Sequence, residues 1–583
     1  MYSSTILTMR MINAKAIYYK YFQGEGEKNM KKKLVSLALV TCMVASLLAG
    51  CGSTGGTTTT STTDSTVTTN TTTTAADTAT DTTAAYTKAG ADGEVVVGIA
   101  ADPENMGPWS GMSMGRIAVL YTIYEYLVTT AGGETYGVLA KNYNKVDDQT
   151  YDVELYDNIH DTAGNPLTAS DVVFSFNTAI ATKNYGKLEC VESVTAIDAT
   201  HVEFKFNKTL EKGQFEDVMM ECAIVTQAAY EASPDEMATD PVGTTAYAVT
   251  SYVPGSSLVL EDTGNYWQTD ASLIHTTSAH NVPKITMSVI TDASQMTVAL
   301  QTHSIDISNW IPDSDIAKFQ EGGDSAEGNS VAMIPDNITY DMEFNMSSDS
   351  VFQNDQNLRL AIAYAIDKQG LNDGVFNGHG WAVKDFANAN YVDYISDWDN
   401  QDYYDYNVDT AKAYLAKSNY AGQSLRLFYT TSSTSDTIAQ MLQAYLGEIG
   451  VTVELMPLDS MIAQSTQYDS TAFDLEMKST GSTDYIVNQW KLCWDERDYK
   501  EMTGGTANFV VGDTQLATLM QAALNVDTYG PESISAFHDY LVKQCYGFGM
   551  VQGTINIVHS SYITDVALDA RNQLLPGACA LAE

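Results

Sequence analysis

The sequence predicts an α/β protein whose folded body has two lobes or more. Polar and apolar residues alternate in 149–156 and in 201–207, so each segment is expected to be a strand with one face in a core. The segment between them reads as the start of a helix, with Thr168 or Ser170 as its cap and Asp171 near the positive end of the helix dipole. About 490 residues follow the low-complexity N-terminal region, more than one ordinary hydrophobic core organises.

Residues 30–50 have the features of a secretory signal that ends in a lipidation site. A lysine triplet at 31–33 precedes an apolar run of about 15 residues, short of the ~20 that a membrane-spanning helix needs. The run ends in Leu-Ala-Gly-Cys at 48–51, which resembles the lipobox of bacterial lipoproteins. That resemblance implies cleavage before Cys51 and a lipid anchor on it, at the outer face of a bacterial cell membrane, in a Gram-positive cell. The alternative is an ordinary secretory leader with an incidental cysteine.

The stretch 1–29 does not fit a signal peptide, because Glu25 and Glu27 precede the basic segment. The Gly-Glu codons before Met30 can read as a purine-rich ribosome-binding sequence. We therefore expect translation to start at Met30, so that 1–29 is not part of the natural protein.

Residues 51–87 separate the signal from the folded body. They are mostly Thr, Ser, Ala and Asp, with almost no aliphatic or aromatic side chains, and cannot bury a core. We expect them to be a disordered tether that holds the body away from the membrane. The body then begins near residue 88, with its first strand at 93–100, a β-branched run bounded by glycine.

The mature chain is strongly acidic. Removing 1–50 takes away seven Lys/Arg and two Asp/Glu, which leaves 30 − 7 = 23 basic and 73 − 2 = 71 acidic residues, a formal charge of −48. Such a charge disfavours nucleic acid as a partner and keeps a surface protein soluble as a monomer. We interpret the surplus carboxylates as a solvated surface rather than as a site for a cationic partner.

The cysteines and histidines do not predict a disulfide framework, a metal site or a cofactor. The cysteines left after processing are odd in number and lack CxxC spacing: Cys190, Cys222, Cys493, Cys545 and Cys579. Cys190 and Cys222 could pair if their strands are adjacent. No zinc, Walker or dinucleotide-binding motif occurs, so no catalysis is expected. A surface-anchored hydrolase that uses scattered acid pairs is left as the alternative from another class.

Several segments match, in order, the motifs of one family of binding proteins. In 151–175 a strand is followed by a turn with Gly-Asn-Pro-Leu-Thr-Ala and then Asp-Val, although the turn carries two extra residues at 161–164. Residues 240–247 read Asp-Pro-Val-Gly-Thr-Thr-Ala-Tyr, and Asn-Tyr-Trp follows at 265–267. The remaining matches are 299–307, 343–345, 357–368, whose apolar spacing is helical, 404–415, 425–430 and 446–455. This order resembles the family 5 extracellular solute-binding proteins, the peptide-binding lipoproteins that feed oligopeptide and dipeptide ABC importers.

The resemblance implies a periplasmic-binding-protein-like fold of the large class. Two hinge-linked α/β lobes would close around a ligand and deliver it to the permease subunits of the importer. By segment order, lobe I is 88–336, with an extra subdomain at about 124–240, and lobe II is 337–550. The chain then returns to lobe I at 551–583, with hinge crossings near 335–340 and 550–559.

The resemblance also implies a ligand anchor at Asp484. In peptide binders of this family a strand leads to an Asp-Tyr step whose carboxylate pairs with the N-terminal ammonium of the peptide, and Asp484-Tyr485 has this layout. Tyr340, Tyr485 and Trp490 are candidates to line the cleft with apolar surface. Gly481 stands where an aromatic residue often lies, so an oligosaccharide or a metal chelate is kept as an alternative ligand, and a surface-loop role as the alternative for Asp484.

The segment 393–406 is rich in Asp and Tyr. It lacks the glycine and the terminal glutamate of an EF-hand loop. We predict a solvated connecting loop rather than a calcium or sugar site.

Overall fold

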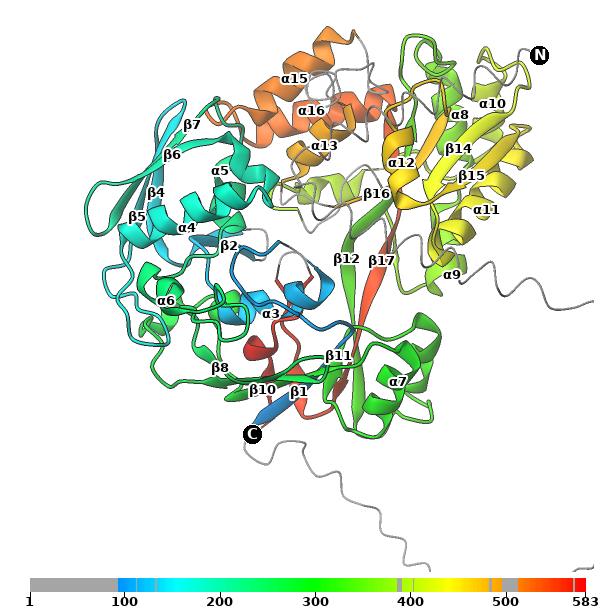
Figure 1. The fold of residues 1–583 in the computed structure, drawn as a ribbon. Coiled ribbons are helices and arrows are strands. Elements are labelled where there is room, and N and C mark those ends of the chain that lie inside the picture. The colour runs from blue at the N-terminus through cyan, green and yellow to red at the C-terminus, as the bar shows by residue number, and fades with distance from the viewer. Residues whose placement is uncertain are drawn as a thin grey trace, which may run out of the picture. The chain divides into compact units, whose positions relative to one another are not determined.

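The computed structural model describes residues 93–582 of the 583-residue chain, apart from 112, 132–133, 385–390, 402, 482–484, 495–511 and 570–571 (Figure 1). The proposed start at Met30, the signal, Cys51 and the tether lie outside the described residues, and so does Asp484. None of the described helices is both long and apolar enough to span a bilayer.

A mixed sheet of 11 strands runs through the described part of the chain. Its order is β15-β14-β16-β12-β17-β11-β1-β10-β9-β8, and β13 pairs with β17 off this path. The strands are β1 (Glu94–Ile99), β8 (Tyr247–Val253), β9 (Ser257–Asp262), β10 (Lys284–Val289), β11 (Ile307–Ser308), β12 (Asn329–Phe344), β13 (Trp381–Ala382), β14 (Leu425–Thr430), β15 (Val453–Leu458), β16 (Leu475–Thr480) and β17 (Gly547–Ser560).

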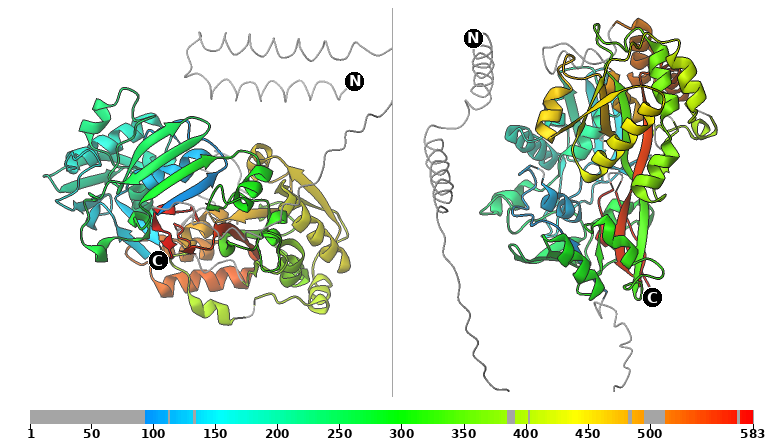
Figure 2. Two further views of the ribbon diagram at one scale, coloured as in Figure 1. Left: turned by 90° about the horizontal axis from the view of Figure 1, so that it is seen from below. Right: turned by 90° about the vertical axis from the view of Figure 1, so that its right-hand side faces the viewer.

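Two long antiparallel strands, β12 and β17, join the two halves of this sheet (Figures 1 and 2). Their pairing is regular up to Pro335 and resumes at Thr339, where the register has shifted. Three residues of β12, 336–338, stand there opposite the single residue Gly553 of β17. A bulge of this kind bends and twists a strand pair, so the two halves of the sheet meet at a built-in irregularity.

Each half of the sheet has its own hydrophobic core, and these cores define the two lobes. The lobe I core contains residues of β1, β10 and the end of β17, including Val95, Ile285 and Ile557. The lobe II core contains residues of β14 and the start of β17, including Leu427 and Phe548. The predicted boundaries at 336 and 550 fall inside β12 and β17, and we propose these two strands as the hinge.

Lobe I carries a second sheet in the region between α3 (Met114–Ile123) and β8. Four antiparallel strands form it in the order β4-β5-β7-β6, and a separate hairpin pairs β2 with β3. The strands are β2 (Val128–Ala131), β3 (Glu134–Gly137), β4 (Ala140–Asp147), β5 (Thr150–Leu155), β6 (Val191–Ala196) and β7 (His201–Phe206). The last described residues add the hairpin of β18 (Ile563–Asp565) and β19 (Ala580–Leu581).

The longer helices divide between the two lobes. Lobe I has α3 (Met114–Ile123), α4 (Ala169–Thr182), α5 (Gln214–Glu221), α6 (Gln227–Ala232) and α7 (Ala293–Gln301). Lobe II has α8 (Gln356–Ala365), α9 (Lys368–Phe376), α10 (Val408–Leu415), α11 (Ser433–Glu448), α12 (Ser460–Thr466), α13 (Ile486–Trp494), α15 (Thr514–Leu524) and α16 (Pro531–Gln544).

The local predictions of strands and caps are confirmed, with one exception. The strands expected at 149–156 and 201–207 are β5 and β7, and Thr168 caps α4 in a capping box with Asp171. The helical pattern at 357–368, in contrast, is broken. Asp367 accepts a hydrogen bond from the Gly370 N–H at 2.8 Å and caps a new helix, α9.

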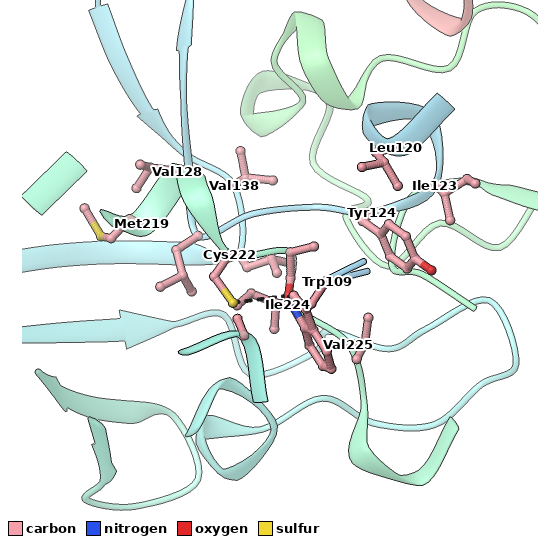
Figure 3. Close-up of a cluster of buried hydrophobic side chains, with 14 of the residues drawn as sticks. Trp109, Leu120, Ile123, Tyr124, Val128, Val138, Met219, Cys222, Ile224 and Val225 are labelled. Atoms are coloured by element: carbon pink, nitrogen blue, oxygen red, sulfur yellow. Dashed lines mark hydrogen bonds between the residues drawn. The ribbon is translucent and has the colours of Figure 1, made fainter. Parts of the chain in front are cut away.

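All five cysteines in the described part of the chain are free thiols, Cys190 and Cys222 included. Cys222 is fully buried beside Trp109, whose indole N–H donates to the Ala223 carbonyl at 3.0 Å (Figure 3). Burial raises the pKa of the Cys222 thiol well above its usual range. This thiol is therefore part of the lobe I core.

Candidate functional site

Asp484, the predicted ligand anchor, lies outside the described residues, but its neighbour Tyr485 is described. Tyr485 directly precedes α13 and is buried in lobe II. Its ring centroid is 6.2 Å from that of Tyr529, with the rings edge to face. The Asp484-Tyr485 step therefore comes immediately before the first turn of α13.

The other two predicted cleft residues lie in different surroundings. Tyr340 is half-buried on β12, just past the register shift, opposite Val551 of β17. Trp490 lies on α13 and is fully buried, and its ring packs against Trp398, Phe537 and His538 of lobe II. Trp490 thus has the contacts of a core residue, whereas Tyr340 lies beside the hinge. Their roles toward a ligand stay predictions.

The segment 393–406 corrects one sequence prediction in part. Residues 393, 398, 403 and 404 are buried in lobe II, whereas 396, 397, 400, 401, 405 and 406 are exposed, as predicted for a solvated loop. Asp393 is buried and caps α13: its carboxylate accepts from the Ile486 N–H at 2.5 Å and from the Val487 N–H at 3.4 Å. Burial raises the pKa of Asp393 to about 6. Tyr403 and Tyr404 are buried as well. The polar composition of this segment predicted exposure throughout. Asp393, however, accepts hydrogen bonds at a helix terminus, and the two tyrosines pack in a core.

The loop before α5 joins lobe I to α13 and α15 of lobe II. Glu211 is ion-paired with Lys491 of α13. The Lys212 backbone N–H donates to the Leu524 carbonyl at 2.7 Å, and the Asn488 side-chain amide donates to the Lys212 carbonyl at 3.0 Å. These contacts connect two lobes whose cores are separate, so they join this loop of lobe I to lobe II.

Gly213 allows the backbone of this loop to approach Tyr485. Its φ of +84° is in the left-handed region, and a Cβ built on it would lie 2.5 Å from a Tyr485 ring carbon. Next to it, the Lys212 ammonium lies 5.0 Å from the Tyr485 ring centroid and 5.4 Å from that of Tyr529. It also lies 3.0 Å from a Glu216 carboxylate oxygen. The lobes therefore meet through a glycine, a cation and two aromatic rings.

Lobe I also has a hollow, with an empty volume of about 500 Å³ that includes open solvent at its mouth. We call it the lobe I hollow. At one side it is lined by Asp569, whose loop reaches the proposed hinge through a hydrogen bond from the Asn572 amide to the Pro335 carbonyl at 3.3 Å. At the other side it is lined by Met220 of α5. Its lining thus includes one residue from the loop that contacts the proposed hinge and one from α5.

Glu125, which also lines the lobe I hollow, is a buried carboxylate that sequence reasoning missed. Its Oε1 accepts from the Tyr266 hydroxyl at 2.5 Å and the Ser278 hydroxyl at 2.9 Å, and its Oε2 from the Trp267 indole N–H at 2.8 Å. Burial raises the pKa of Glu125. The available signal was a single acid between Tyr124 and Tyr126 in an otherwise apolar stretch.

A serine pattern at the start of α3 also escaped the sequence analysis. Residues 111–115 read Gly-Met-Ser-Met-Gly, which matches the GxSxG pattern of serine hydrolases. In the structure, however, Ser113 is the cap of α3, and its hydroxyl accepts from the Arg116 N–H at 3.4 Å. In the described part of the chain, no hydrogen bond joins Ser113 to a histidine or a carboxylate, so the pattern serves a helix start.

Comparison with known proteins gives a consistent result. Residues 134–494 match the middle region of the bacterial extracellular solute-binding proteins, family 5. The chain is 23% identical over 370 residues to the nickel-binding protein NikA of Staphylococcus aureus, covering 62% of this chain and 70% of the relative. It is 23% identical over 492 residues to the probable D,D-dipeptide-binding periplasmic protein DdpA of Escherichia coli, covering 78% of this chain and 89% of the relative.

Solved structures share the fold. The structure of HbpA2 from Haemophilus parasuis superposes with a TM-score of 0.71 at 17% identity, covering 84% of this chain and 100% of that one. The substrate-binding protein CtaP of Listeria monocytogenes gives a TM-score of 0.67 at 20% identity, covering 84% and 99%. The two-lobed α/β architecture is therefore the one that the sequence predicted.

Proposed function

This chain belongs to the bacterial extracellular solute-binding proteins of family 5, and on that premise we propose that it captures oligopeptides or dipeptides. It is the substrate-binding component of an ABC importer and hands its solute to membrane permease subunits. The relatives it matches are solute-binding proteins rather than enzymes, and this chain binds its solute without transforming it.

The observation that carries the peptide proposal is the position of Asp484 directly before Tyr485 and α13. The helix that follows this carboxylate is also the helix that contacts Glu211 and Lys212 of lobe I. A peptide ammonium bound by Asp484 would therefore be held at the start of the element that joins the lobes. A charge-assisted hydrogen bond of this kind contributes roughly 1.5–3 kcal/mol.

A thermal-shift series on residues 88–583 tests the ligand. We expect peptides with a free N-terminus to raise the melting temperature. At a ligand concentration of 100 Kd, binding adds about 2.7 kcal/mol to the free energy of unfolding. N-acetylated peptides should not do so, because acetylation removes the ammonium. Asp484→Asn should lose the shift, whereas Asp405→Asn, at an exposed position of lobe II, should keep it.

The likeness to NikA of Staphylococcus aureus keeps a metal chelate as the second candidate ligand. A NikA structure from that organism is described as a complex with Ni(L-His)2. The same thermal-shift series therefore includes Ni(L-His)2 and a set of oligosaccharides. Stabilisation by one of these and by no peptide would replace the peptide proposal and leave the fold unchanged.

We further propose that lipid on Cys51 anchors the protein to the outer face of the cell membrane. The support is the Leu-Ala-Gly-Cys junction after an apolar run too short to span a bilayer. Fatty-acid labelling of cells that express the full chain should mark the protein. Cys51→Ser should abolish the label and release the protein into the medium, and a label that persists would place the lipid elsewhere.

A further inference from the structure

The lobe I hollow has an acidic and aromatic lining. Glu125 and Asp569 supply carboxyl groups, and Tyr121, Tyr124 and Tyr126 supply rings. Among the described residues that line it, none is a lysine, an arginine or a histidine. Such a lining repels an anionic group and attracts a cationic one.

The carboxyl group of Glu125 has no cationic partner in the described part of the chain. The residue is only 4% exposed, and its hydrogen-bond donors among the described residues, the Tyr266 and Ser278 hydroxyls and the Trp267 indole, are uncharged. A buried carboxylate without a counter-ion is costly, and burial accordingly raises its pKa. A ligand cation at the hollow would supply the missing positive charge.

The tyrosines around the lobe I hollow suit the same group. The ring centroids of Tyr121 and Tyr126 are 5.3 Å apart, with the ring planes tilted by 40°. The Tyr124 hydroxyl donates to the Met106 carbonyl at 2.9 Å, which fixes that ring. The faces of such rings attract ammonium and guanidinium groups by cation–π interaction.

The remaining lining is apolar and suits an alkyl stem. Val128 and Val138 line the hollow and belong to the lobe I core, as Tyr124 does, and Met220 lines the hollow from α5. The Thr277 hydroxyl, which also lines the hollow, is buried and has no hydrogen-bond partner among the described residues. A flexible stem that ends in a hydrogen-bond donor matches these neighbours.

We propose that the lobe I hollow binds the organic cation of the ligand, an alkylammonium or guanidinium group on an alkyl stem. The inference rests on the proposed peptide function and deepens it: the preferred peptide carries a basic side chain. Its N-terminal ammonium is bound on lobe II at Asp484, and its basic side chain enters lobe I.

Isothermal titration of residues 88–583 with three tripeptides tests this inference. Ala-Lys-Ala and Ala-Arg-Ala carry the two cations, and Ala-norleucine-Ala carries the same kind of stem without the charge. We expect the lysine or the arginine peptide to bind about tenfold more tightly than the norleucine peptide. The difference in affinity between the lysine and arginine peptides shows whether the hollow prefers an ammonium or a guanidinium group.

Two variants assign the preference to the hollow. Glu125→Gln should reduce the ratio between the basic and norleucine affinities to near one, whereas Glu261→Gln, at an exposed position of lobe I, should leave it unchanged. Should Glu125→Gln not fold, Tyr121→Leu serves instead, because it removes an aromatic face and keeps an apolar side chain. For Tyr121→Leu, too, we expect a lower ratio of basic-peptide to norleucine-peptide affinity than for the wild type.

The outcomes separate the two proposals. Equal affinities for the three peptides, or a preference that both Glu125→Gln and Tyr121→Leu retain, would overturn the inference and leave the peptide function in place. Absence of binding by all three peptides would overturn the peptide function, and the inference with it.

Discussion

The ammonium group of Lys491 on α13 is ion-paired with the carboxylate of Glu211, although 280 positions separate these residues in the sequence. Glu211 lies before α5 in lobe I, and α13 belongs to lobe II, so the pair depends on closure of the lobes. α13 begins two residues after Asp484. In the sequence, the proposed ligand anchor therefore comes just before the helix that carries the ion pair.

Removing the Lys491 charge should speed ligand release. The Lys491 side chain is 10% exposed and that of Glu211 is 28% exposed, so the pair is partly shielded from water and we expect it to contribute about 1 kcal/mol to the closed form. Lys491→Met should therefore raise the dissociation rate constant by about fivefold in stopped-flow experiments, with little change in the association rate.

Glu211→Gln and the double variant complete a thermodynamic cycle for this pair. Lys141→Met is the matched control, because its ion pair with Glu154 lies within lobe I. A dissociation rate that changes equally in Lys491→Met and Lys141→Met would rule out the interlobe role of Lys491.

Gly213→Ala should impair closure more than it impairs folding. The substitution meets both a left-handed φ and the ring of Tyr485, at 2.5 Å from the new Cβ. The φ alone costs roughly 1–2 kcal/mol, and the clash is relieved only when the lobes separate. We expect a larger radius of gyration in small-angle X-ray scattering and a weaker affinity for the ligand.

Gly255→Ala separates these two causes. Gly255 also has a positive φ, of +70°, but a Cβ there would meet nothing within 4 Å. This variant should lose stability without a change in radius or affinity. If Gly213→Ala behaves in the same way as Gly255→Ala, the contact with Tyr485 has no part in closure.

A buried acidic cluster beneath α13 makes stability depend on pH. In the register of β12 and β16, Asp341 is opposite Lys478 and Glu343 is opposite Glu476. The Lys478 ammonium is 3.4 Å from Glu343 and 3.9 Å from the Cys493 sulfur of α13. One lysine thus faces three acids, and burial raises the pKa of Glu476 to about 8.

The sign of this effect follows from proton binding. Between the usual carboxyl pKa of about 4.5 and the folded value near 8, the folded protein holds a proton on Glu476 that the unfolded chain releases. The contribution of Glu476 to the free energy of unfolding is therefore most favourable below pH 4.5, and it is lost as the pH rises to 8. Glu476→Gln should raise stability at pH 8 by an amount on the order of a few kcal/mol and flatten the slope.

Denaturant unfolding at pH 5, 6.5 and 8 measures this slope. Glu454→Gln on β15, at an exposed position of the same lobe, is the control. A Glu476→Gln protein with the wild-type pH slope would mean that Glu476 is ionised in the folded protein at neutral pH.

Trp490 and Tyr340 should differ in what they affect. Trp490 is fully buried among aromatic rings, so Trp490→Ala should cost about 3–5 kcal/mol of stability. Tyr340→Leu, at a half-buried position beside the hinge, should lower ligand affinity with little loss of stability. Melting temperatures and titrations of both variants check this difference, and an unchanged affinity of Tyr340→Leu would remove Tyr340 from the cleft.

Local sequence patterns predicted the strands and the helix start that depend on interactions between residues close in the sequence. Alternation predicted β5 and β7, and the Thr168-Asp171 spacing predicted the start of α4. The break before α9 was missed because apolar residues continue at helical spacing across it, and the capping property of Asp367 was not weighed against that periodicity.

The contacts between distant segments could not be predicted in this way. Asp393 caps α13 across 93 positions, and Glu125 gains its three donors only when residues about 140 to 150 positions later fold against it. From their residue type alone, Asp393 and Glu125 are predicted to be exposed, because both are charged. Their burial depends on the tertiary fold.

Native mass spectrometry of residues 88–583, purified without unfolding, tests the central claim most directly. We predict that the wild-type protein carries small molecules whose fragments are those of peptides, with basic residues enriched, and that Asp484→Asn carries none. Bound sugars or metal chelates, or the same peptides on Asp484→Asn, would contradict the account.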